Sequence, residues 1–307
     1  MNAENCDFQS IKSIDLDRNL RLMNFYTPNT ELRALISLLD DPDSGVYENV
    51  SSRLVAYGKT IIPHLETVWE YNAKNGIQNR VEEIIQQIEF EVCSSTLASW
   101  KNNGCIDLFE GAIKASLFQY PNQETDLMLS QIELLRKDVW LELNENLTSL
   151  EKIRVLNHIL YDVHHFGSYI KYWSSDQSWF LYNVLEHKKG SPTAMAILYK
   201  SLADKLELPV VGINLPDHFI LGYKDLYNHT GDELLFYINP FSKGAVFGKG
   251  ELERYIQKMN LEVSVEELRP MNNQQIIKRY LTDLKSGYRK LNRYRKLDQV
   301  DQLLRIF

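Results

Sequence analysis

Residues 179–223 read WFLYNVLEHKKGSPTAMAILYKSLADKLELPVVGINLPDHFILGY, and within this stretch the pattern changes from helix to strand. Ser191 and Pro192 form a good helix start, because Ser191 supplies a capping oxygen and Pro192 takes the first helical position, where its missing N–H is harmless. The segment 193–206 is apolar around much of its circumference and stops before Pro209. A helix with this pattern is buried, so we predict a central helix here.

Three short segments after that helix have the alternation of strands, namely 210–214, 218–223 and 234–239. If the last two form a symmetric hairpin, paired residue numbers sum to 457, and His218 lies opposite Asn239. Directly opposed residues have Cβ atoms roughly 4.5–5.5 Å apart, close enough for the Asn239 amide to orient the imidazole. A slip of one residue would place these two side chains on opposite faces.

The rest of the chain is predominantly helical by its hydrophobic spacing. Residues 31–90 carry a leucine stripe, a break at 41–43 and a second stripe with valines, which resembles one HEAT-type helical pair. Thr148 and Glu151 form a capping box, and the segment after Pro270 returns to helix. Helices, then an antiparallel sheet, then helices indicate a helix-rich α+β fold without the strand–helix alternation of a doubly wound sheet.

We therefore predict three parts: a HEAT-like helical domain at 1–95, an α+β core at 96–270 and a basic helical hairpin at 271–307. The chain has 34 Lys and Arg against 41 Asp and Glu, a net charge of -7, which argues against a nucleic-acid partner. Residues 271–307 hold nine Lys or Arg and three Asp, so this segment carries +6 and the remainder -13. A solvated helical face explains this charge, and the alternative is an anionic partner or a docking contact.

The composition argues against a membrane span, a secretory signal, a disulfide framework and a zinc site. No apolar run approaches the length of a membrane span, and the first residues are polar and acidic, unlike a secretory signal. Cys6, Cys93 and Cys105 are too few and too scattered for a disulfide framework or a zinc cluster. We expect a cytoplasmic protein with no membrane partner and no cofactor.

The stretch 179–241 resembles the SirB-type branch of the transglutaminase-like superfamily, and a fainter likeness begins near residue 100. The matching residues are Asn183, Val184, Leu185, Gly190, Pro192, Leu198, Tyr199, Leu206, Leu208, Pro209, Pro216, His218, Phe219, Pro240 and Phe241. The resemblance implies a papain-like core in which a central helix packs on a small antiparallel sheet. The basic C-terminal segment resembles, more weakly, the TPR-like helices that often close such proteins.

The resemblance also implies a Cys–His–Asn/Asp site, and here the sequence departs from the family pattern. Active members have Gly-x-Cys at the helix start, whereas Pro192 occupies the nucleophile position in this chain. His218 matches the family histidine, and Asn239 stands where an aspartate usually precedes Pro-Phe. Asp217 replaces the glycine that commonly precedes the histidine. We expect His218 and Asn239 to be the remnant of a triad that lost its nucleophile.

The candidate cleft residues are Ser191, Thr193, Trp179, Tyr182 and Asp217. The aromatic residues could line a groove, although aromatic side chains more often belong to the core. Ser191 is expected to be engaged as a helix cap, and Thr193 to point about 100° away from position 192 along the helix.

A separate pattern, His158, Asp162 and His165 on one predicted helical face, could hold a metal. No His-Glu-x-x-His arrangement supports it, and the expected metal content is none.

Together these observations predict a non-catalytic transglutaminase-like protein that binds a peptide or protein segment as a scaffold or regulator. The alternative is an acyl-transfer hydrolase or transamidase that uses His218 and Asn239 with a non-standard nucleophile. A third, weaker alternative is a metal-dependent hydrolase built on residues 158–165.

Overall fold

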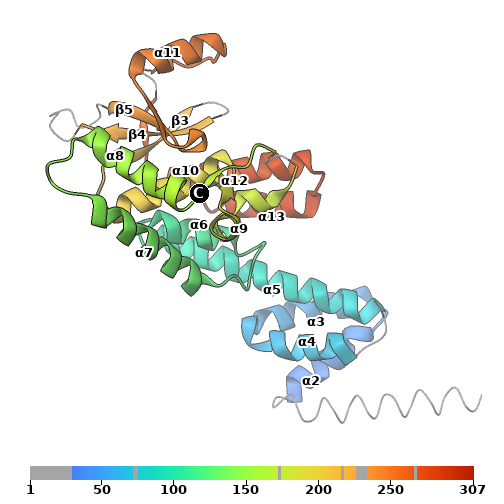
Figure 1. Cartoon of the computed structure of the whole chain (residues 1–307). Coiled ribbons are helices and arrows are strands. Elements are labelled where there is room, and N and C mark those ends of the chain that lie inside the picture. Colours follow the sequence, from blue (N-terminus) through green and yellow to red (C-terminus); the bar gives the residue numbers. More distant parts are fainter. Residues whose placement is uncertain (1–29, 72–74, 172–173, 216–217, 226–233, 266–267) are drawn as a thin grey trace, which may run out of the picture. The chain divides into compact units, whose positions relative to one another are not determined.

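The structure of the chain is a computed structural model that describes residues 30–71, 75–171, 174–215, 218–225, 234–265 and 268–307. The chain divides into two compact units, Met1–Val92 and Cys93–Phe307 (Figure 1). The first unit holds the segment that we predict to be HEAT-like, and the second holds both the predicted core and the basic hairpin. The three-part division and the HEAT-like and TPR-like resemblances stay predictions.

The first unit is helical, as the hydrophobic stripes predict. Its helices are α2 (Thr30–Ser37), α3 (Ser44–Ala56), α4 (Ile62–Tyr71) and the beginning of α5 (Asn75–Asn102). The predicted break lies between α2 and α3, where the Asp43 side chain accepts a hydrogen bond from the Gly45 N–H at 2.8 Å and caps α3. The leucine and valine stripes, including Leu39 and Leu54, meet in one buried core.

The second unit contains most of the helices. After the end of α5 these are α6 (Leu108–Ser116), α7 (Thr125–Glu142), α8 (Ser149–Asn157), α9 (Leu181–His187), α10 (Pro192–Lys205), α11 (Lys249–Lys258), α12 (Asn273–Lys290) and α13 (Tyr294–Leu304). Thr148 and Glu151 form the predicted capping box before α8. A π-helical turn, His158–Val163, follows α8 directly.

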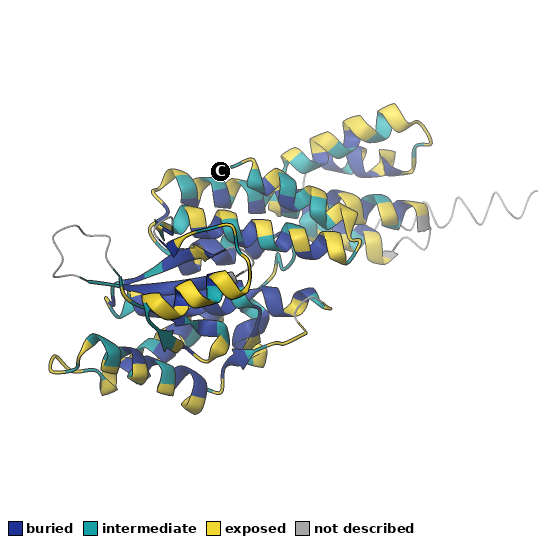
Figure 2. Cartoon of the chain, turned by 90° about the horizontal axis from the view of Figure 1, so that it is seen from above, coloured by how far each residue is buried: buried dark blue, intermediate teal, exposed yellow. Residues whose placement is uncertain are grey.

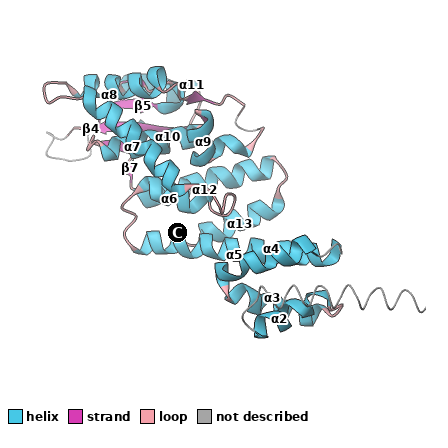
Figure 3. Ribbon diagram, turned by 60° about the horizontal axis from the view of Figure 1, so that its bottom comes forward, coloured by secondary structure: helices cyan, strands magenta, loops and turns pink. Residues whose placement is uncertain are grey.

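The strands of the second unit form two sheets. The larger has five antiparallel strands in the order β6-β5-β4-β3-β7, with the bounds β3 (Val210–Leu215), β4 (His218–Lys224), β5 (Leu234–Asn239), β6 (Ala245–Phe247) and β7 (Pro270–Met271). The smaller pairs β1 (Gly167–Ser168) with β2 (Lys189–Gly190) in parallel. Figure 3 shows the strands gathered at one part of this otherwise helical unit. The architecture is the predicted helix-rich α+β fold.

The register between β4 and β5 differs from the predicted one. Residue numbers of most pairs sum to 459, as in Leu221 with Ile238, whereas the symmetric hairpin required 457. Two causes add up: β4 runs one residue further, to Lys224, and a bulge leaves Leu235 as an extra residue in β5. The predicted direct opposition of His218 and Asn239 is therefore wrong. If the pairing with a sum of 459 continued to the end of β5, Asn239 would lie opposite Ile220, two residues from His218.

The five-stranded sheet lies between two helical layers. On one face, strand residues including Ile213, Ile220 and Tyr237 pack with Leu252 and Ile256 of α11. Helices α10 and α12 cover the other face (Figure 1). Figure 2 shows the strands buried between helices whose outer surfaces are exposed.

The basic C-terminal segment forms α12 and α13, and several of its charges are paired. Arg279 binds Asp283 within α12, Lys285 binds Asp301 of α13, and Arg293 binds Asp176. Lys296 donates to the backbone oxygen of Phe118 at 2.8 Å.

Buried apolar residues of the two helices, including Ile276, Tyr288 and Val300, join the hairpin to its own unit. Much of the positive charge thus stabilises the fold. Among the described residues, no helix combines the length and hydrophobicity needed to cross a membrane.

Candidate functional site

The start of α10 is built as the sequence predicts. The Ser191 hydroxyl oxygen accepts a hydrogen bond from the Ala194 N–H at 3.4 Å, and Pro192 is the first helical residue. The Ser191 N–H donates to the backbone oxygen of Ser178 at 2.8 Å, which fixes the incoming strand. Ser191 is 7% exposed. Its hydroxyl is therefore a buried helix cap, and the adjacent proline brings no ionisable or nucleophilic atom to the helix N-terminus.

The Thr193 hydroxyl belongs to a polar chain that ties α10 to α12 and β3. Thr193 Oγ1 donates to Asp283 Oδ2, and Arg279 Nε donates to Asp283 Oδ1 at 2.9 Å. The other end of the guanidinium donates from Nη1 to Asn214 Oδ1. The Asp283 carboxylate is ion-paired with Arg279, and Thr193 is buried. These hydrogen bonds therefore form a structural network that fixes α10 and α12 against β3.

His218 and Asn239 begin β4 and end β5. Asn239 is in phase with Tyr237, which packs toward α11, whereas the side chain of His218 lies outside the described part of the structure. The Asn239 Oδ1 accepts from the N–H groups of Phe241 and Ser242, at 3.1 and 3.2 Å, and so caps the turn that follows β5. Its oxygen is already engaged, which leaves the amide N–H groups for any other partner. The triad role of this pair stays a prediction.

Side chains from three other elements hold that turn. Tyr161 of the π-helical turn donates from its hydroxyl to the Pro240 oxygen at 2.8 Å, and Ser168 of β1 donates to the Phe241 oxygen. Burial raises the pKa of Tyr161 far above its ordinary value, so this phenol stays a neutral donor. The backbone oxygens of the Pro-Phe turn are thus held by side chains from two other elements.

A third contact, from Asn157 of α8, fixes the end of the turn. Asn157 Nδ2 donates to the Gly244 oxygen at 2.8 Å, while Asn157 Oδ1 accepts from the hydroxyl of Tyr199 in α10, also at 2.8 Å. Gly244 has φ +68°, and a Cβ at this position would overlap the Asn157 amide. The central helix, α8 and the turn after β5 are therefore joined through one amide side chain.

The described cysteines do not supply the missing nucleophile. Cys93 is fully buried, its thiol donates to the Lys114 oxygen at 3.2 Å, and burial raises its pKa to about 12. Burial also raises the pKa of the Cys105 thiol. Cys105 lines a pocket together with Lys200, eight residues beyond Pro192 and about 12 Å further along α10. Cys6 lies outside the described residues.

The predicted aromatic cleft residues pack inside the second unit. Trp179 is 4% exposed and lies edge-to-face against Tyr288 of α12, with ring centroids 5.3 Å apart. Tyr182 lies 5.7 Å from the ring of Tyr120. The candidate Asp217 lies outside the described residues. The contacts of Trp179 are those of a core residue.

Residues 158–165 do not form one continuous helical face. His158 and Asp162 approach to 3.2 Å in the π-helical turn, while His165 has φ +59° and lies beyond it. His164 is bound to Asp138 of α7 at 2.8 Å. Within the ranges that the structure describes, no group of three or more potential metal ligands is assembled. The change of helical phase separates His165 from the other two candidates.

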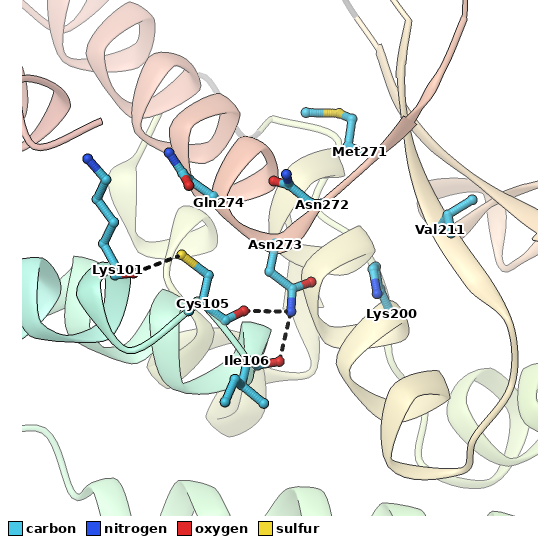
Figure 4. A pocket seen from close by; sticks show the side chains of 10 residues that line it. Lys101, Cys105, Ile106, Lys200, Val211, Met271, Asn272, Asn273 and Gln274 are labelled. Carbon is cyan, nitrogen blue, oxygen red and sulfur yellow. Dashed lines mark hydrogen bonds between the residues drawn. The ribbon is translucent and has the colours of Figure 1, made fainter.

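One pocket of the second unit, with a volume of about 390 Å³, lies beside the middle of α10 (Figure 4). The Asn273 Nδ2 donates to the backbone oxygens of Cys105 and Ile106, at 3.0 and 2.9 Å, and joins the start of α12 to this wall. The pocket therefore lies away from the helix N-terminus, where the family places its nucleophile.

The two lysines of that pocket already have acceptors. Lys101 Nζ donates to the Ile306 oxygen at 2.6 Å, and Lys200 Nζ contacts both carboxylate oxygens of Asp204 at 2.8 Å. Burial raises the pKa of Asp204. Both lysine side chains that line the pocket are therefore bound to acceptors within the fold.

Another, smaller pocket, of about 190 Å³, lies beside the segment that leads into α10. Ser178 and Asn183 are buried residues of its lining, and Lys189 is an exposed one. Because the Ser178 oxygen also holds the Ser191 N–H, this pocket adjoins the start of the central helix.

Sequence patterns did not reveal the polar residues that organise this region. Asn157 and Tyr161 are four residues apart and face the Pro-Phe turn, and Asp283 receives the Thr193 hydroxyl from a distant helix. The one sequence signal for these residues was a side chain with a polar atom at a helical position predicted to be buried, such as Tyr199. A hydrophobic pattern alone does not say what such a polar atom binds. Their partners lie 42 to 90 residues away in sequence, so local spacing could not pair them.

Comparison with known proteins places the chain in a family. Residues 126–282 match the family model described as the transglutaminase-like superfamily. A UPF0162 protein of Vibrio cholerae is 28% identical over 194 residues, which cover 62% of this chain and 69% of that protein. Protein SirB1 of Salmonella typhimurium is 28% identical over 197 residues, covering 62% and 70%.

A shorter likeness extends to F-box only protein 21 of Mus musculus, which is 27% identical over 159 residues, 49% of this chain but 23% of that protein. No solved structure matches the chain. The matched segment spans the capping box, the central helix and all three long strands of the sheet, together with most of α12. By this match and its SirB1 and UPF0162 relatives, the chain belongs to the transglutaminase-like superfamily as a SirB-type member.

Proposed function

We propose that this chain is a non-catalytic transglutaminase-like protein that binds a peptide or protein segment, as a scaffold or regulator. The observation that carries the proposal is Pro192 as the first residue of α10, at the position where active members of the superfamily have cysteine. A thiol at a helix N-terminus is activated by the local field, whereas a proline side chain offers no atom that can attack.

The groups around Pro192 support the same conclusion. The Ser191 hydroxyl oxygen accepts from Ala194, and the Thr193 hydroxyl donates to Asp283, so both adjacent hydroxyls have structural partners. The oxygen of Asn239 is engaged by the turn after β5, although a triad amide has to accept the imidazole N–H to hold its tautomer. The hydroxyls of Ser191 and Thr193 and the oxygen of Asn239 are thus engaged within the fold.

The rival function is an acyl-transfer hydrolase or transamidase that uses His218 and Asn239 with another nucleophile. Thr193 is the hydroxyl on which this rival depends most, because it adjoins position 192 and is hydrogen-bonded to a carboxylate. The ion pair between Asp283 and Arg279 opposes that role, since a carboxylate held by a guanidinium is a weaker base.

The catalytic part is tested with acyl donors and covalent probes. Purified chain is incubated with ester and glutamine-peptide substrates and with fluorophosphonate and iodoacetamide probes, in parallel with His218→Ala and Thr193→Val. We expect no turnover above buffer in any sample and no probe on α10. Turnover by the wild type that both substitutions abolish would establish the rival and end the proposal.

The binding part is tested with an array of 15-residue peptides. We expect a subset of sequences to bind the wild type, and the same subset to bind His218→Ala with unchanged affinity, because binding does not need a base. Absence of any peptide that binds the folded chain would contradict the scaffold role.

The basic hairpin is a second place for a partner, and its exposed cations can be tested without removing it. Deletion of 271–307 would remove buried residues such as Tyr288 and uncover Trp179, which packs against it, so charge reversal is the cleaner change. The exposed Arg289, Arg295 and Arg305 can each be replaced by glutamate. Peptide binding that depends on these three residues would place the function on the hairpin. A cytoplasmic location stays a prediction.

A further inference from the structure

Helix α7 exposes more large apolar side chains than any other helix that the structure describes. They are Leu127, Leu129, Leu134, Trp140 and Leu141. Figure 1 shows α7 on the outside of the second unit. Single exposed leucines are common on protein surfaces, but apolar side chains that adjoin one another on one element indicate an interaction surface.

Three of these side chains form a row along the helix, which we call the leucine row: Leu127, Leu134 and Leu141, with exposures of 49%, 53% and 63%. A spacing of seven residues falls only about 20° short of two full turns, so the three side chains lie nearly in line. The buried residues of α7 are Met128, Ile132, Leu135 and Val139. At about 100° per residue, the leucine row lies roughly 130° around the helix from this buried face. The row is therefore not part of the core of the chain.

The spacing of the leucine row fits a second helix with the same row. Apolar residues at seven-residue intervals insert between those of a facing helix, as in a coiled coil. The row is also symmetric, because Leu127 and Leu141 are equally far from Leu134. A two-fold axis at Leu134 would pair this residue with its own copy and Leu127 with Leu141 of the second copy. An interface between identical copies has to be self-complementary in this way.

The polar residues beside the row are compatible with an antiparallel pair. Lys137 is exposed and has no ion-pair partner among the described residues. In antiparallel register it would lie next to Glu133 of the second copy. Hydrogen bonds from Arg136 and Lys205 lower the pKa of the Glu133 carboxyl, so this group is ionised at neutral pH. The attraction between Lys137 and Glu133 therefore supports this register.

The other side of the row brings no close repulsion in the same register. Gln131 would lie next to Asp138 of the second copy, while the two Asp138 residues would be about 12 Å apart along the helix axis. At that distance the repulsion between two exposed charges is largely screened by salt. The two helix dipoles would also run in opposite directions, which is favourable.

We propose that the leucine row of α7 is the docking surface for a second copy of this chain, with the two α7 helices antiparallel. The row is smaller than a standard protein–protein interface, so we expect a weak dimer with a dissociation constant of about 10–100 μM. The proposed dimer is independent of peptide binding. Together with that binding, it would give a scaffold two binding sites for its partners.

The first experiment measures self-association of the full chain by sedimentation equilibrium over a range of concentrations that brackets the expected dissociation constant. We expect a reversible monomer–dimer equilibrium for the wild type. Leu134→Arg places a positive charge against its own copy at the two-fold axis, and should weaken the dimer at least about 20-fold.

Leu129→Arg is the matched control. Leu129 is an exposed leucine of the same helix, but it lies roughly 140° around α7 from the leucine row. We expect this variant to dimerise as the wild type does, and circular dichroism to show that both variants are folded. Equal loss of the dimer in both variants, or in neither, would overturn the assignment of the row. A wild type that stays monomeric at every concentration would overturn the second copy as the occupant, and would leave the row to a helix of another protein.

The second experiment tests the register with single cysteines and leaves the folded surface nearly unchanged. Cys93 and Cys105 are buried, and Cys6 is replaced by serine in every sample. A disulfide forms only where two Cα atoms come within about 7 Å. We expect Leu134→Cys to cross-link with itself on mild oxidation. Leu127→Cys and Leu141→Cys should cross-link only when the two variants are mixed, because each residue would lie about 21 Å from its own copy along the helix axis.

Self-linking of Leu127→Cys as fast as that of Leu134→Cys would overturn the antiparallel register, because a parallel pair brings every position next to its own copy. These outcomes are separate from the test of the proposed function. Leu134→Arg should bind the same peptides of the array as the wild type, whether or not the wild type dimerises. His218-dependent turnover would remove the non-catalytic role and leave the measured dimer constant as it is.

Discussion

At position 192, the residue that begins the central helix carries a side chain that cannot take part in acyl transfer, and the hydroxyls on either side are bound within the fold. The turn after β5 is also held by side-chain hydrogen bonds, because Asn239 caps its start and Asn157 binds the backbone oxygen of Gly244 at its end. Single substitutions in this region should therefore change the free energy of unfolding, which can be measured.

Gly244 is the residue at which a single methyl group should be most costly. Gly244→Ala adds a Cβ at φ +68°, where it overlaps the Asn157 amide that links the turn to Tyr199. We expect a loss of roughly 1–3 kcal/mol in the free energy of unfolding, measured by urea denaturation. The control is Gly250→Ala in α11, where a Cβ meets open space and stability should stay level or rise slightly. Equal effects of both would contradict the strained turn.

Cys93 should make stability depend on alkaline pH. Its pKa is raised from 9.0 to about 12 by burial, so between these values the unfolded chain loses a proton that the folded chain keeps. Unfolding is then favoured as the pH rises, by about 1.4 kcal/mol at pH 10 relative to pH 7. The difference in unfolding free energy between wild type and Cys93→Ala should shrink accordingly over that interval. A constant difference would show that the thiol does not stay protonated.

At the scale of elements, α10 is held at both ends by polar contacts and along its length by packing. The N-terminus is tied to α12 and β3 by the chain from Thr193 through Asp283 and Arg279. The register of β4 and β5 is set by a bulge, which moves Asn239 away from direct opposition to His218. The polar contacts at the start of α10 therefore join this helix to α12 and the sheet.

Thr193→Val tests whether the hydroxyl is structural or chemical. Valine keeps the shape and removes the donor to Asp283, so we expect a loss of about 1–2 kcal/mol in unfolding free energy. Thr282→Val is the control, because Thr282 is exposed on α12 and bonds only its own helix, at the Lys278 oxygen. A Thr193→Val protein of unchanged stability would argue against the structural network.

At the scale of the whole molecule, the chain has two compact units with separate cores. The family match begins at residue 126 and therefore lies entirely in the second unit. The helical first unit is an additional part whose partner, if it has one, can be sought independently of the transglutaminase-like core.

Separate cores predict two thermal transitions in scanning calorimetry. Leu54 and Leu198 are both fully buried leucines, one in each unit. Leu54→Ala should lower the free energy of one transition by about 2–5 kcal/mol and leave the other unchanged, and Leu198→Ala should do the reverse. One transition that moves equally in both variants would show that the units unfold together.

Local sequence patterns predicted many of the helix starts and strands of the fold. The Ser191 cap, the Thr148 capping box, the break before Ser44 and the three long strands lie where sequence spacing predicts them. Such features depend on residues within a few positions of each other, so a single sequence contains the information. The short strands β1, β2, β6 and β7 were missed, because two or three residues have no readable period.

What the sequence by itself determined is the family resemblance, the central helix and the proline at its start, since these are properties of contiguous residues. Only the tertiary structure decided that the Thr193 hydroxyl meets Asp283, that a bulge shifts Asn239 relative to His218, and that Asn157 joins the turn after β5 to Tyr199. The physical reason is that a hydrogen bond or a strand register depends on how distant segments pack, and no local periodicity records that packing.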